Sequence, residues 1–414
     1  MAFKRKDIEL TAPVGSYESL MAAIQGGADS VYLGIENLNM RSRSAYNFTR
    51  HDLPDIVKIA HDHKIKSYLT LNTVIYNNDL KIVKPTIDFA IQCGVDAIIG
   101  SDPAVLDHCL RSGIDIHLST QLNISNLDSL RFYSRYGNVA VLARELNLEQ
   151  VKEICDGIKN DPITGPSGKP LRIEIFIHGA LCMAISGKCY LSLHEYNHSA
   201  NRGDCFQICR RSYLLTDKES GREIEVDNEY LMSPKDLMTI HFLNKIINSG
   251  VSVLKIEGRA RSPEYVKTVT SCYNEALNSI AEDSYTDEKI EAWKESLKQV
   301  FNRGFWDGYY LGQKLGEWND VYGSKSTRKK IYVGKGINYF SKIGVAEFLI
   351  ESGELLIGDE FIITGPTTGV IHGKVKEIRI NKEVKDMAKK GEKCSFPLNS
   401  IIRRSDKLYK IVNQ

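Results

Sequence analysis

The run IELTAPVGSYESLMAAIQGGADSVYLGI, residues 8–35, decides the fold of this chain. Two short segments rich in apolar and β-branched residues, 8–14 and 30–35, flank an amphipathic stretch. That stretch begins after Ser16, a residue type that caps helix N-termini. The pattern predicts a strand, a helix and a second strand, which together form a βαβ unit with parallel strands.

The alternation of strand and helix continues to about residue 281, and Thr49 and Ser262-Pro263 mark two further helix starts. Eight strands with helices between them predict a closed (β/α)8 barrel of the TIM type, because an open doubly wound sheet usually has five or six. No G-x-G-x-x-G motif follows any of them, so a dinucleotide site is not supported. The expected strands cover residues 8–14, 30–35, 66–74, 96–101, 115–121, 139–145, 172–179 and 252–258.

The chain has 414 residues, enough for two or three domains. We assign residues 1–281 to the barrel, which includes a cysteine-rich excursion at 182–209. Residues 282–329 are expected to form a helical connector. After residue 330, apolar and polar residues alternate between turns rich in Gly and Asp, which predicts a small antiparallel β-barrel over 330–414.

Composition and charge narrow the class of protein. The hydrophobic fraction is 42% and no run approaches 18 apolar residues, so no membrane partner is expected. Residues 1–7 are polar and no apolar signal segment follows, which indicates a cytoplasmic protein.

The formal charge of +2 hides one local excess of basic residues. Residues 324–342 hold six Lys or Arg side chains and no acid. This run is either a solvated linker or a contact for the phosphate backbone of a nucleic acid.

Four cysteines between residues 182 and 209 have the spacing C-x6-C-x15-C-x3-C. Disulfides would need an oxidising compartment, which nothing in the sequence indicates. A structural zinc site normally has a close pair of cysteines at both ends, whereas iron–sulfur clusters are often held by four unevenly spaced cysteines. Iron–sulfur, zinc and unliganded thiols all remain open from spacing alone. The four residues are Cys182, Cys189, Cys205 and Cys209.

Polar side chains gather at the expected strand ends, where the chemistry of a TIM barrel is located. Glu145, His178 and Glu257 are candidate catalytic residues, although a structural ion pair or a packed histidine is an equally ordinary interpretation. The remaining polar residues at these ends are Arg41, Asn72, Thr73, Gln121, Arg144, Lys255 and Arg259.

The sequence His194-Glu195-Tyr196-Asn197-His198 matches H-E-x-x-H, the zinc-protease motif. That motif needs a helix, and Asn, Ser and Gly crowd the residues that follow Tyr196. A zinc-protease site is therefore not expected.

The stretch EIFIHGALCMAISGKCYLS, residues 174–192, resembles the signature of the U32 peptidase family. The resemblance spans essentially the whole chain. Further segments similar to that family's motifs are LTAPVG near the start, ANRGDC at 200–205, KIEGR at 255–259 followed by SPEY, and NRGFWDGYYLG at 302–312.

This resemblance implies a function other than proteolysis. Members carry the label of collagenase-like proteases, but the better-understood branches are oxygen-independent hydroxylation proteins with a four-cysteine [4Fe-4S] cluster. One barrel followed by a β-domain is most similar to the branch that 5-hydroxylates the wobble uridine of tRNA with prephenate. The implied cluster ligands are Cys182, Cys189, Cys205 and Cys209.

The same resemblance implies prephenate as co-substrate and tRNA as partner. Prephenate is a dicarboxylate, and basic side chains hold carboxylates. We expect substrate contacts from Arg41, Arg144, Arg259, Asn201 and Arg202, and RNA contacts from Arg328, Lys329 and Lys330.

Three other functions stay open. The protein could be a U32 peptidase, a hydroxylation protein for rRNA or a quinone precursor, or a non-catalytic iron–sulfur scaffold paired with a second subunit of the family. The G-x-S-x-G elbow of serine hydrolases is absent, and four clustered cysteines serve a metal better than a cysteine protease, which needs one activated thiolate.

Overall fold

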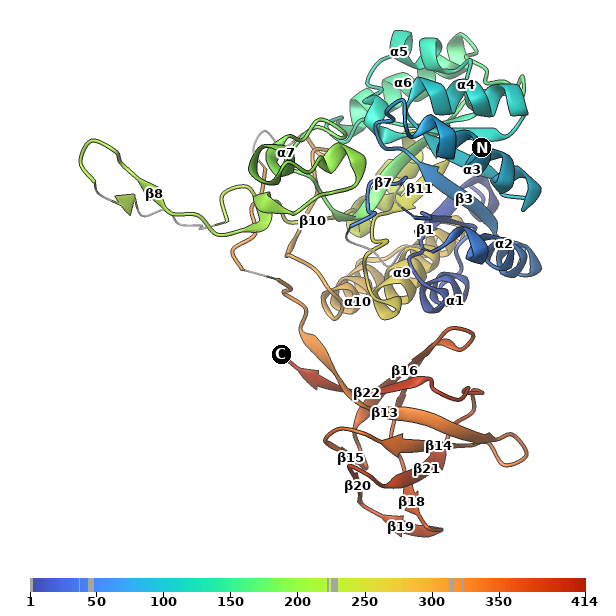
Figure 1. The fold of residues 1–414 in the computed structure, drawn as a ribbon, viewed down its shortest axis with the longest axis vertical. Coiled ribbons are helices and arrows are strands. Elements are labelled where there is room, and N and C mark those ends of the chain that lie inside the picture. Colours follow the sequence, from blue (N-terminus) through green and yellow to red (C-terminus); the bar gives the residue numbers. More distant parts are fainter. Residues whose placement is uncertain are drawn as a thin grey trace.

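The computed structural model describes residues 3–36, 38–43, 48–221, 223–224, 230–312, 316–321 and 323–414. Eight parallel strands form a closed barrel, because the last of them, β11, pairs with both β1 and β7 (Figure 1). This confirms the expected (β/α)8 barrel. Its strands are β1 (Glu9–Pro13), β2 (Ser30–Leu33), β3 (Lys66–Leu71), β4 (Ala97–Gly100), β5 (Asp115–Leu118), β6 (Val139–Val141), β7 (Arg172–Ala180) and β11 (Val253–Ile256).

Helices cover the outside of the barrel and start where the capping residues predict. The side chain of Ser16 accepts a hydrogen bond from the amide of Ser19, and Pro263 is the first residue of α9. Within the described residues, no helix combines the length and apolar character needed to cross a bilayer. The outer helices are α1 (Tyr17–Gln25), α2 (Leu53–Asp62), α3 (Leu80–Gln92), α4 (Pro103–Ser112), α5 (Leu127–Tyr133), α6 (Leu148–Asn160), α8 (Leu243–Asn248) and α9 (Pro263–Ala281).

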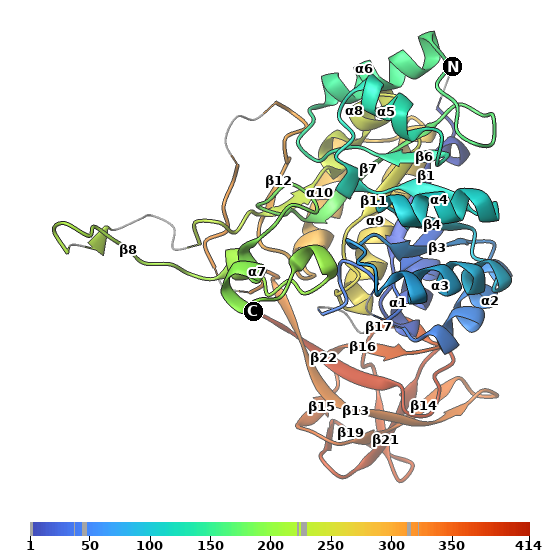
Figure 2. The same cartoon turned by 45° about the horizontal axis from the view of Figure 1, so that its top comes forward.

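A long excursion leaves the barrel after β7. It contains the short helix α7 (Leu191–Tyr196) and the hairpin of β8 (Leu215–Thr216) and β9 (Glu223–Ile224), which projects from one side of the molecule (Figures 1 and 2). The chain returns through β10 (Asp236–Met238), which pairs antiparallel with the end of β7.

The segment expected as a helical connector, residues 282–329, contains both a helix and a strand. Helix α10 (Asp287–Lys298) packs on α9, and β12 (Phe305–Trp306) pairs with β10 and so widens the barrel sheet at its mouth. Residues 313–315 and 322 of this segment lie outside the described residues.

The C-terminal strands are antiparallel, as expected, and enclose a separate core that includes Phe348, Ile363 and Phe396. Eight of them form one sheet, in the order β17-β16-β22-β13-β14-β21-β18-β19, and β15 pairs with β20. They are β13 (Arg328–Phe340), β14 (Val345–Ile350), β15 (Glu354–Leu356), β16 (Glu360–Gly365), β17 (Gly369–Lys374), β18 (Ile378–Ile380), β19 (Glu383–Lys385), β20 (Met387–Lys389), β21 (Lys393–Pro397) and β22 (Lys407–Asn413).

The C-terminal sheet docks on helices α1 and α9 through strand β17 (Figure 2). The side-chain amide of Gln25 donates to the carbonyl of Thr368 (2.9 Å) and accepts from the amide of Val370 (3.0 Å). Lys267 donates to the carbonyl of Val370 (2.7 Å). Ile362 and Val370 are buried in the same apolar cluster as the barrel, so the two parts share packing as well as hydrogen bonds.

Candidate active site at the barrel mouth

A polar cavity of about 110 Å³ opens at the carboxyl ends of the barrel strands. Strand ends that are far apart in the sequence supply its walls, as in other TIM barrels. Its lining contains most of the rim residues predicted from the sequence, namely Arg41, Asn72, Gln121, Arg144, Lys255, Glu257 and Arg259, together with Cys182.

Glu257 is the carboxylate of this cavity and is ion-paired with Arg41. Both Nε and Nη2 of Arg41 donate to Glu257 Oε1, at 3.0 and 2.8 Å. Burial alone would raise the pKa of Glu257, but the charges of Arg41 and Arg144 outweigh burial and lower this pKa to about 2. Glu257 is therefore a fixed negative charge near neutral pH, and a general-base role would require this ion pair to open.

Arg144 and Arg259 donate to neutral oxygens. Arg259 is buried and donates to Thr70 Oγ1 (2.8 Å), and burial lowers its pKa to about 10. Arg144 donates to the carbonyl of Ala180 (3.2 Å) and stacks on Phe176 at 3.9 Å. Its Nε is buried without a hydrogen-bond partner among the residues described. These two guanidinium groups thus keep donors available for an anionic ligand.

A second layer of charges lies directly beneath the cavity. Lys255 donates to Glu174 (2.7 Å), which also contacts Nδ1 of His117 (2.9 Å). All three side chains are buried. Burial would raise the pKa of Glu174, but Lys255 and His117 lower it to about 2. The sequence reasoning named Lys255 but missed Glu174 and His117, and the signal for them is a carboxylate between the apolar residues Ile173 and Ile175 of strand β7.

The other two candidate catalytic residues lie away from this cavity. His178 is 1% exposed and packs against Tyr265, Tyr273 and Phe305. Burial lowers its pKa to about 3, so it is neutral. Glu145 is exposed and lines a neighbouring cavity of about 90 Å³, together with Trp306 and Trp318. Of the three candidates, the mouth cavity contains Glu257 alone.

The four cysteines of the excursion lie together beside the mouth. A second cavity of about 110 Å³ is lined by Cys182, Cys205 and Cys209 and shares Arg41 and Glu257 with the first. Burial raises the pKa of Cys209 to about 11, and the thiols of Cys182, Cys205 and Cys189 act in the same direction. Each of the other three thiols is thus close enough to interact with Cys209.

The four cysteine thiols suit an iron–sulfur cluster better than a single metal ion. Within the described ranges, no three His, Cys, Asp or Glu side chains converge closely enough to hold one metal ion. A four-iron cluster takes one thiolate at each of four corners, so its ligands surround a space instead of meeting at a point. Three thiols that line one cavity, with the thiol of Cys189 close enough to interact with Cys209, are compatible with that arrangement.

Asn201 and Arg202, which were expected to bind substrate, anchor the excursion on the loop after β3. Asn201 accepts from the amide of Val74 through its carbonyl (3.0 Å) and from the amide of Cys189 through Oδ1 (3.2 Å). Arg202 pairs with Asp79 (2.6 Å) and stacks on Tyr76 at 3.9 Å. The mouth cavity is lined by other residues, so both side chains position the cysteine segment.

The H-E-x-x-H motif does not form the face of a helix. Helix α7 ends at Tyr196, and Asn197 adopts a left-handed conformation with φ of 55°. Glu195 pairs with Arg211 (3.2 Å), and His198 contacts Asp204 (3.2 Å). The two histidines of the motif therefore lie on different segments, as the helix-breaking residues predict.

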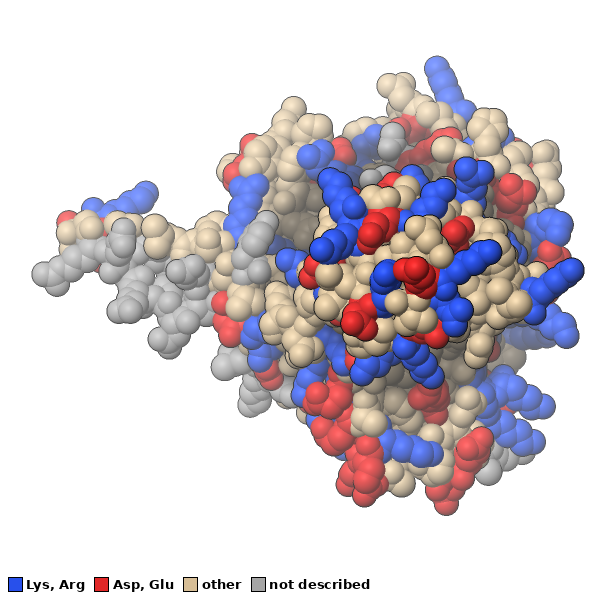
Figure 3. All heavy atoms as spheres, turned by 90° about the horizontal axis from the view of Figure 1, so that it is seen from below, with Lys and Arg blue, Asp and Glu red and all other residues tan. Residues whose placement is uncertain are grey.

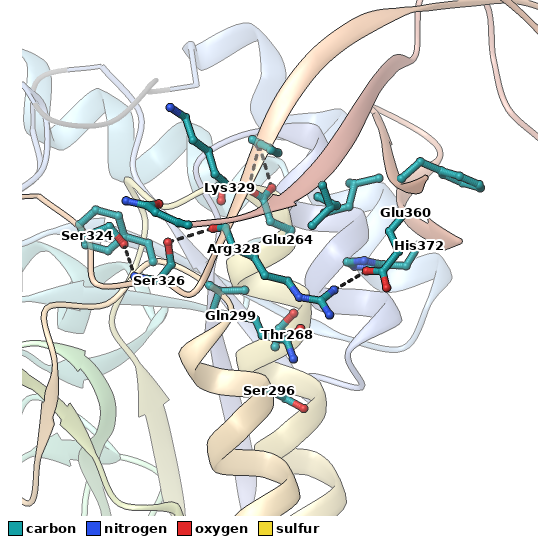
Figure 4. A pocket seen from close by; sticks show the side chains of 18 of the residues that line it. Glu264, Thr268, Ser296, Gln299, Ser324, Ser326, Arg328, Lys329, Glu360 and His372 are labelled. Carbon is teal, nitrogen blue, oxygen red and sulfur yellow. Dashed lines mark hydrogen bonds and ion pairs between the residues drawn. The ribbon is translucent and has the colours of Figure 1, made fainter. Parts of the chain in front are cut away.

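The basic run lies in strand β13 and its approach, so it is not a solvated linker. Arg328 pairs with Glu360, and Lys330 pairs with Glu264 of α9 at 2.8 Å. Figure 4 shows Arg328 directed toward Glu360 inside a pocket of about 600 Å³ between the C-terminal strands and helices α9 and α10. On the face of the C-terminal strands, basic and acidic side chains are mixed (Figure 3). The positive charge of the run is therefore partly neutralised.

Sequence comparisons agree with this architecture. The sequence model described as Peptidase family U32 matches residues 15–320. A protein from Porphyromonas gingivalis named collagenase is 61% identical over 404 residues, 98% of each chain. The tRNA hydroxylation protein P1 of Bacillus subtilis is 32% identical over 342 residues, 81% of this chain and 78% of that protein. A 23S rRNA 5-hydroxycytidine synthase of Escherichia coli is 34% identical over 317 residues, 75% of this chain and 46% of that one.

The match to the family covers most of the barrel, the cysteine excursion and α10. The relatives extend the similarity to nearly the whole length of the chain. The chain therefore belongs to the peptidase family U32.

Proposed function

We propose that this protein is an iron–sulfur-dependent RNA hydroxylation protein that acts on the wobble uridine of tRNA and uses prephenate. The observation that carries the proposal is the juxtaposition of two cavities at the barrel mouth. One is lined by cysteines and the other by arginines, and they share Cys182, Arg41 and Glu257. The names of the relatives from B. subtilis and E. coli support hydroxylation of RNA as the reaction class.

The charges of the mouth suit a small dianion. Carboxylates within the cavity and beneath it are already paired with Arg41 and Lys255. Arg144 and Arg259 donate to neutral oxygens, which a carboxylate can replace as a stronger acceptor. Two guanidinium groups of this kind match the two carboxylates of prephenate.

The thiolates of Cys182, Cys189, Cys205 and Cys209 would hold a [4Fe-4S] cluster, which supplies electron transfer or binds an oxygen-bearing group. The residues of this chain then have three tasks. Arg144 and Arg259 orient the co-substrate, Glu257 keeps Arg41 in place, and the excursion excludes water from the mouth. Glu174 fixes Lys255 at the floor of the cavity through their ion pair.

A peptidase is the second candidate, because the relative that is 61% identical is named collagenase. A zinc-dependent peptidase has little support in the geometry of H-E-x-x-H, since His198 lies beyond the end of α7.

Mass spectrometry of nucleosides from total tRNA and rRNA, with and without the gene for this chain, tests the proposal. We expect 5-hydroxyuridine-derived nucleosides of tRNA to disappear without the gene and to return with the wild-type gene but not with Cys205→Ala. A change confined to rRNA would move the substrate to rRNA. Unchanged nucleosides, together with gelatin degradation by a preparation that contains no iron, would refute hydroxylation in favour of proteolysis.

A further inference from the structure

Aromatic side chains, three of them exposed and Phe206 half-buried, gather on the cysteine excursion and on the loop that it contacts. We call Tyr76, Tyr190, Tyr196 and Phe206 the aromatic face. Tyr190 is 68% exposed and Tyr76 is 56% exposed, which is unusual for side chains that gain by burial. Tyr190 directly precedes helix α7, and Tyr196 ends it.

Specific contacts join the members of the aromatic face in pairs. Asn201 binds the amides of both Val74 and Cys189, which places the segments of Tyr76 and Tyr190 beside each other. The rings of Tyr196 and Phe206 stack with centroids 4.6 Å apart. The aromatic face is thus attached to the segment that carries the cysteines.

Arginine side chains stack on these rings. The guanidinium of Arg43 lies 3.6 Å above Phe206, and that of Arg202 lies 3.9 Å above Tyr76. Arg211 lies 5.4 Å from the ring of Tyr196. Planar guanidinium groups stacked on aromatic rings extend the flat surface on which further planar groups can stack. Two of these arginines, Arg202 and Arg211, also have acidic partners in Asp79 and Glu195, so the stacking surface and not net charge is the feature of this face.

We infer that the aromatic face binds an unpaired loop of RNA by stacking its bases, and so delivers the target base to the mouth cavity. This inference rests on the proposed function and names the surface on which the RNA docks. Unpaired bases stack on aromatic rings and arginine planes, whereas paired bases present only their edges. Two of the four cysteines adjoin this surface, because Cys189 precedes Tyr190 and Cys205 precedes Phe206.

The basic run of β13 is a weaker docking surface on the same criteria. Arg328 and Lys330 are paired with Glu360 and Glu264, whereas Tyr190 and Tyr76 present exposed rings. We therefore place the recognition of single-stranded RNA on the excursion. Strand β13 would contact at most the phosphate backbone of the RNA, away from the target base.

The test measures the affinity of the full-length, iron-loaded protein for total tRNA, a single-stranded RNA oligonucleotide and a blunt RNA duplex. The double variant Tyr76→Ala/Tyr190→Ala should bind tRNA and the single strand at least about tenfold more weakly, the effect of losing one or two stacked bases. The slope of affinity against salt concentration should stay unchanged, because no charge is removed. Tyr76→Phe/Tyr190→Phe should bind like the wild type, since the rings remain.

Phe132→Ala is the matched control. Phe132 is 53% exposed and carries a stacked arginine, Arg135, at 4.3 Å, but it lies near the end of α5, which faces the opposite end of the barrel. This variant should keep the affinity of the wild type. Iron content should be the same in all of these proteins, which shows that the excursion is intact.

An unchanged RNA affinity in the double alanine variant would overturn the inference while leaving the proposed function standing. If that variant nevertheless lost tRNA hydroxylation in cells, the face would dock a protein instead. Conversely, RNA binding through the aromatic face together with unaltered nucleosides in cells that lack the gene would refute the proposed function alone.

Discussion

The barrel mouth and the start of strand β13 are both rich in basic residues, yet their charges are in different states. At the mouth, Arg41 and Lys255 are paired with Glu257 and Glu174, but two further guanidinium groups donate to neutral oxygens: Arg144 and Arg259, the latter 6% exposed. On β13, the side chains of Arg328 and Lys330 are 35% and 30% exposed, and each has its own glutamate partner.

This difference shows that charge counted along the sequence does not predict the local field. The β13 run has no acid within it, but the fold brings Glu264 from α9 and Glu360 from β16. The mouth draws its cations from segments that are far apart, so no basic run marks it in the sequence. Buried cations that exceed their carboxylates indicate an anion site more strongly than an exposed basic run does.

The largest effect is expected at the cysteines. Anaerobically purified wild-type protein should contain about four iron and four sulfide per chain, and Cys205→Ala should lose both together with all hydroxylation activity. Chemical iron and sulfide analysis and the visible absorption spectrum measure this. Cys93→Ala, a half-buried and isolated cysteine, is the control and should retain the iron. Stoichiometric zinc without sulfide would contradict the cluster.

Arg144→Ala should weaken binding of prephenate by about 10- to 100-fold, the cost of one hydrogen-bonded ion pair with a carboxylate. Calorimetric titration of the iron-loaded protein measures it. Arg131→Ala is the control. Arg131 lies on the outer helix α5, is exposed and is paired with Asp161, so its removal should leave the affinity for prephenate unchanged. Equal affinities for all three proteins would mean that the excess charge of the mouth serves another ligand.

Glu257→Gln should lower the free energy of unfolding at pH 7 by about 2 to 3 kcal/mol, because Arg41 loses its charged partner. The pKa of Glu257 is lowered from 4.5 to about 2, so its contribution is complete above pH 4.5 and is lost as the pH falls toward 2. Denaturant unfolding from pH 7 to pH 3 should therefore show the wild type converging on the variant.

Glu195→Gln is the matched control for that experiment. It neutralises a more exposed carboxylate, paired with Arg211, and should cost less than about 1 kcal/mol. If the free energy of unfolding of the wild type exceeded that of Glu257→Gln by the same amount at every pH, the Arg41 pair would contribute through packing and not through charge.

The smallest effect is expected on β13. Lys329 is exposed, and its side chain points away from the pair of Arg328 and Glu360 at the edge of their pocket (Figure 4). Lys329→Ala should therefore reduce the salt slope of tRNA binding by about 0.7 to 0.9, the effect of losing one phosphate contact. Arg328→Ala and Lys330→Ala should change the slope less, because their charges are already paired. If the salt slope fell equally for all three variants, the pairing of Arg328 and Lys330 with glutamates would not weaken their contact with RNA, and β13 would not differ from the barrel mouth in this respect.

The barrel could be predicted from the sequence because each βα unit carries its own signals. Ser16, Thr49 and Pro263 mark helix starts, and the β-branched runs mark strands, so local periodicity was sufficient. The position of the rim residues followed from the same reasoning, since parallel strands end at one edge.

The partners of the charged residues could not be predicted in this way. Lys330 and Glu264 are 66 residues apart, and Lys255 and Glu174 are 81 apart, so no local pattern links them. His178 follows the alternation of β7, but its burial against Tyr265 and Tyr273 depends on α9, which packs there only in the folded chain. Tertiary contacts of this kind decide which rim residues are free to act.

The hydrogen bonds between Gln25 and strand β17 affect how this molecule unfolds. The side chain of Gln25 makes two hydrogen bonds to the backbone at strand β17, and Val370 of that strand is buried in the apolar cluster of the barrel. Unfolding of either part therefore exposes apolar surface of the other. The two parts should then unfold in one cooperative transition. A chain that ended at residue 327 would expose the surfaces of α1 and α9 on which strand β17 packs. The barrel and the C-terminal strands are therefore best regarded as a single thermodynamic unit.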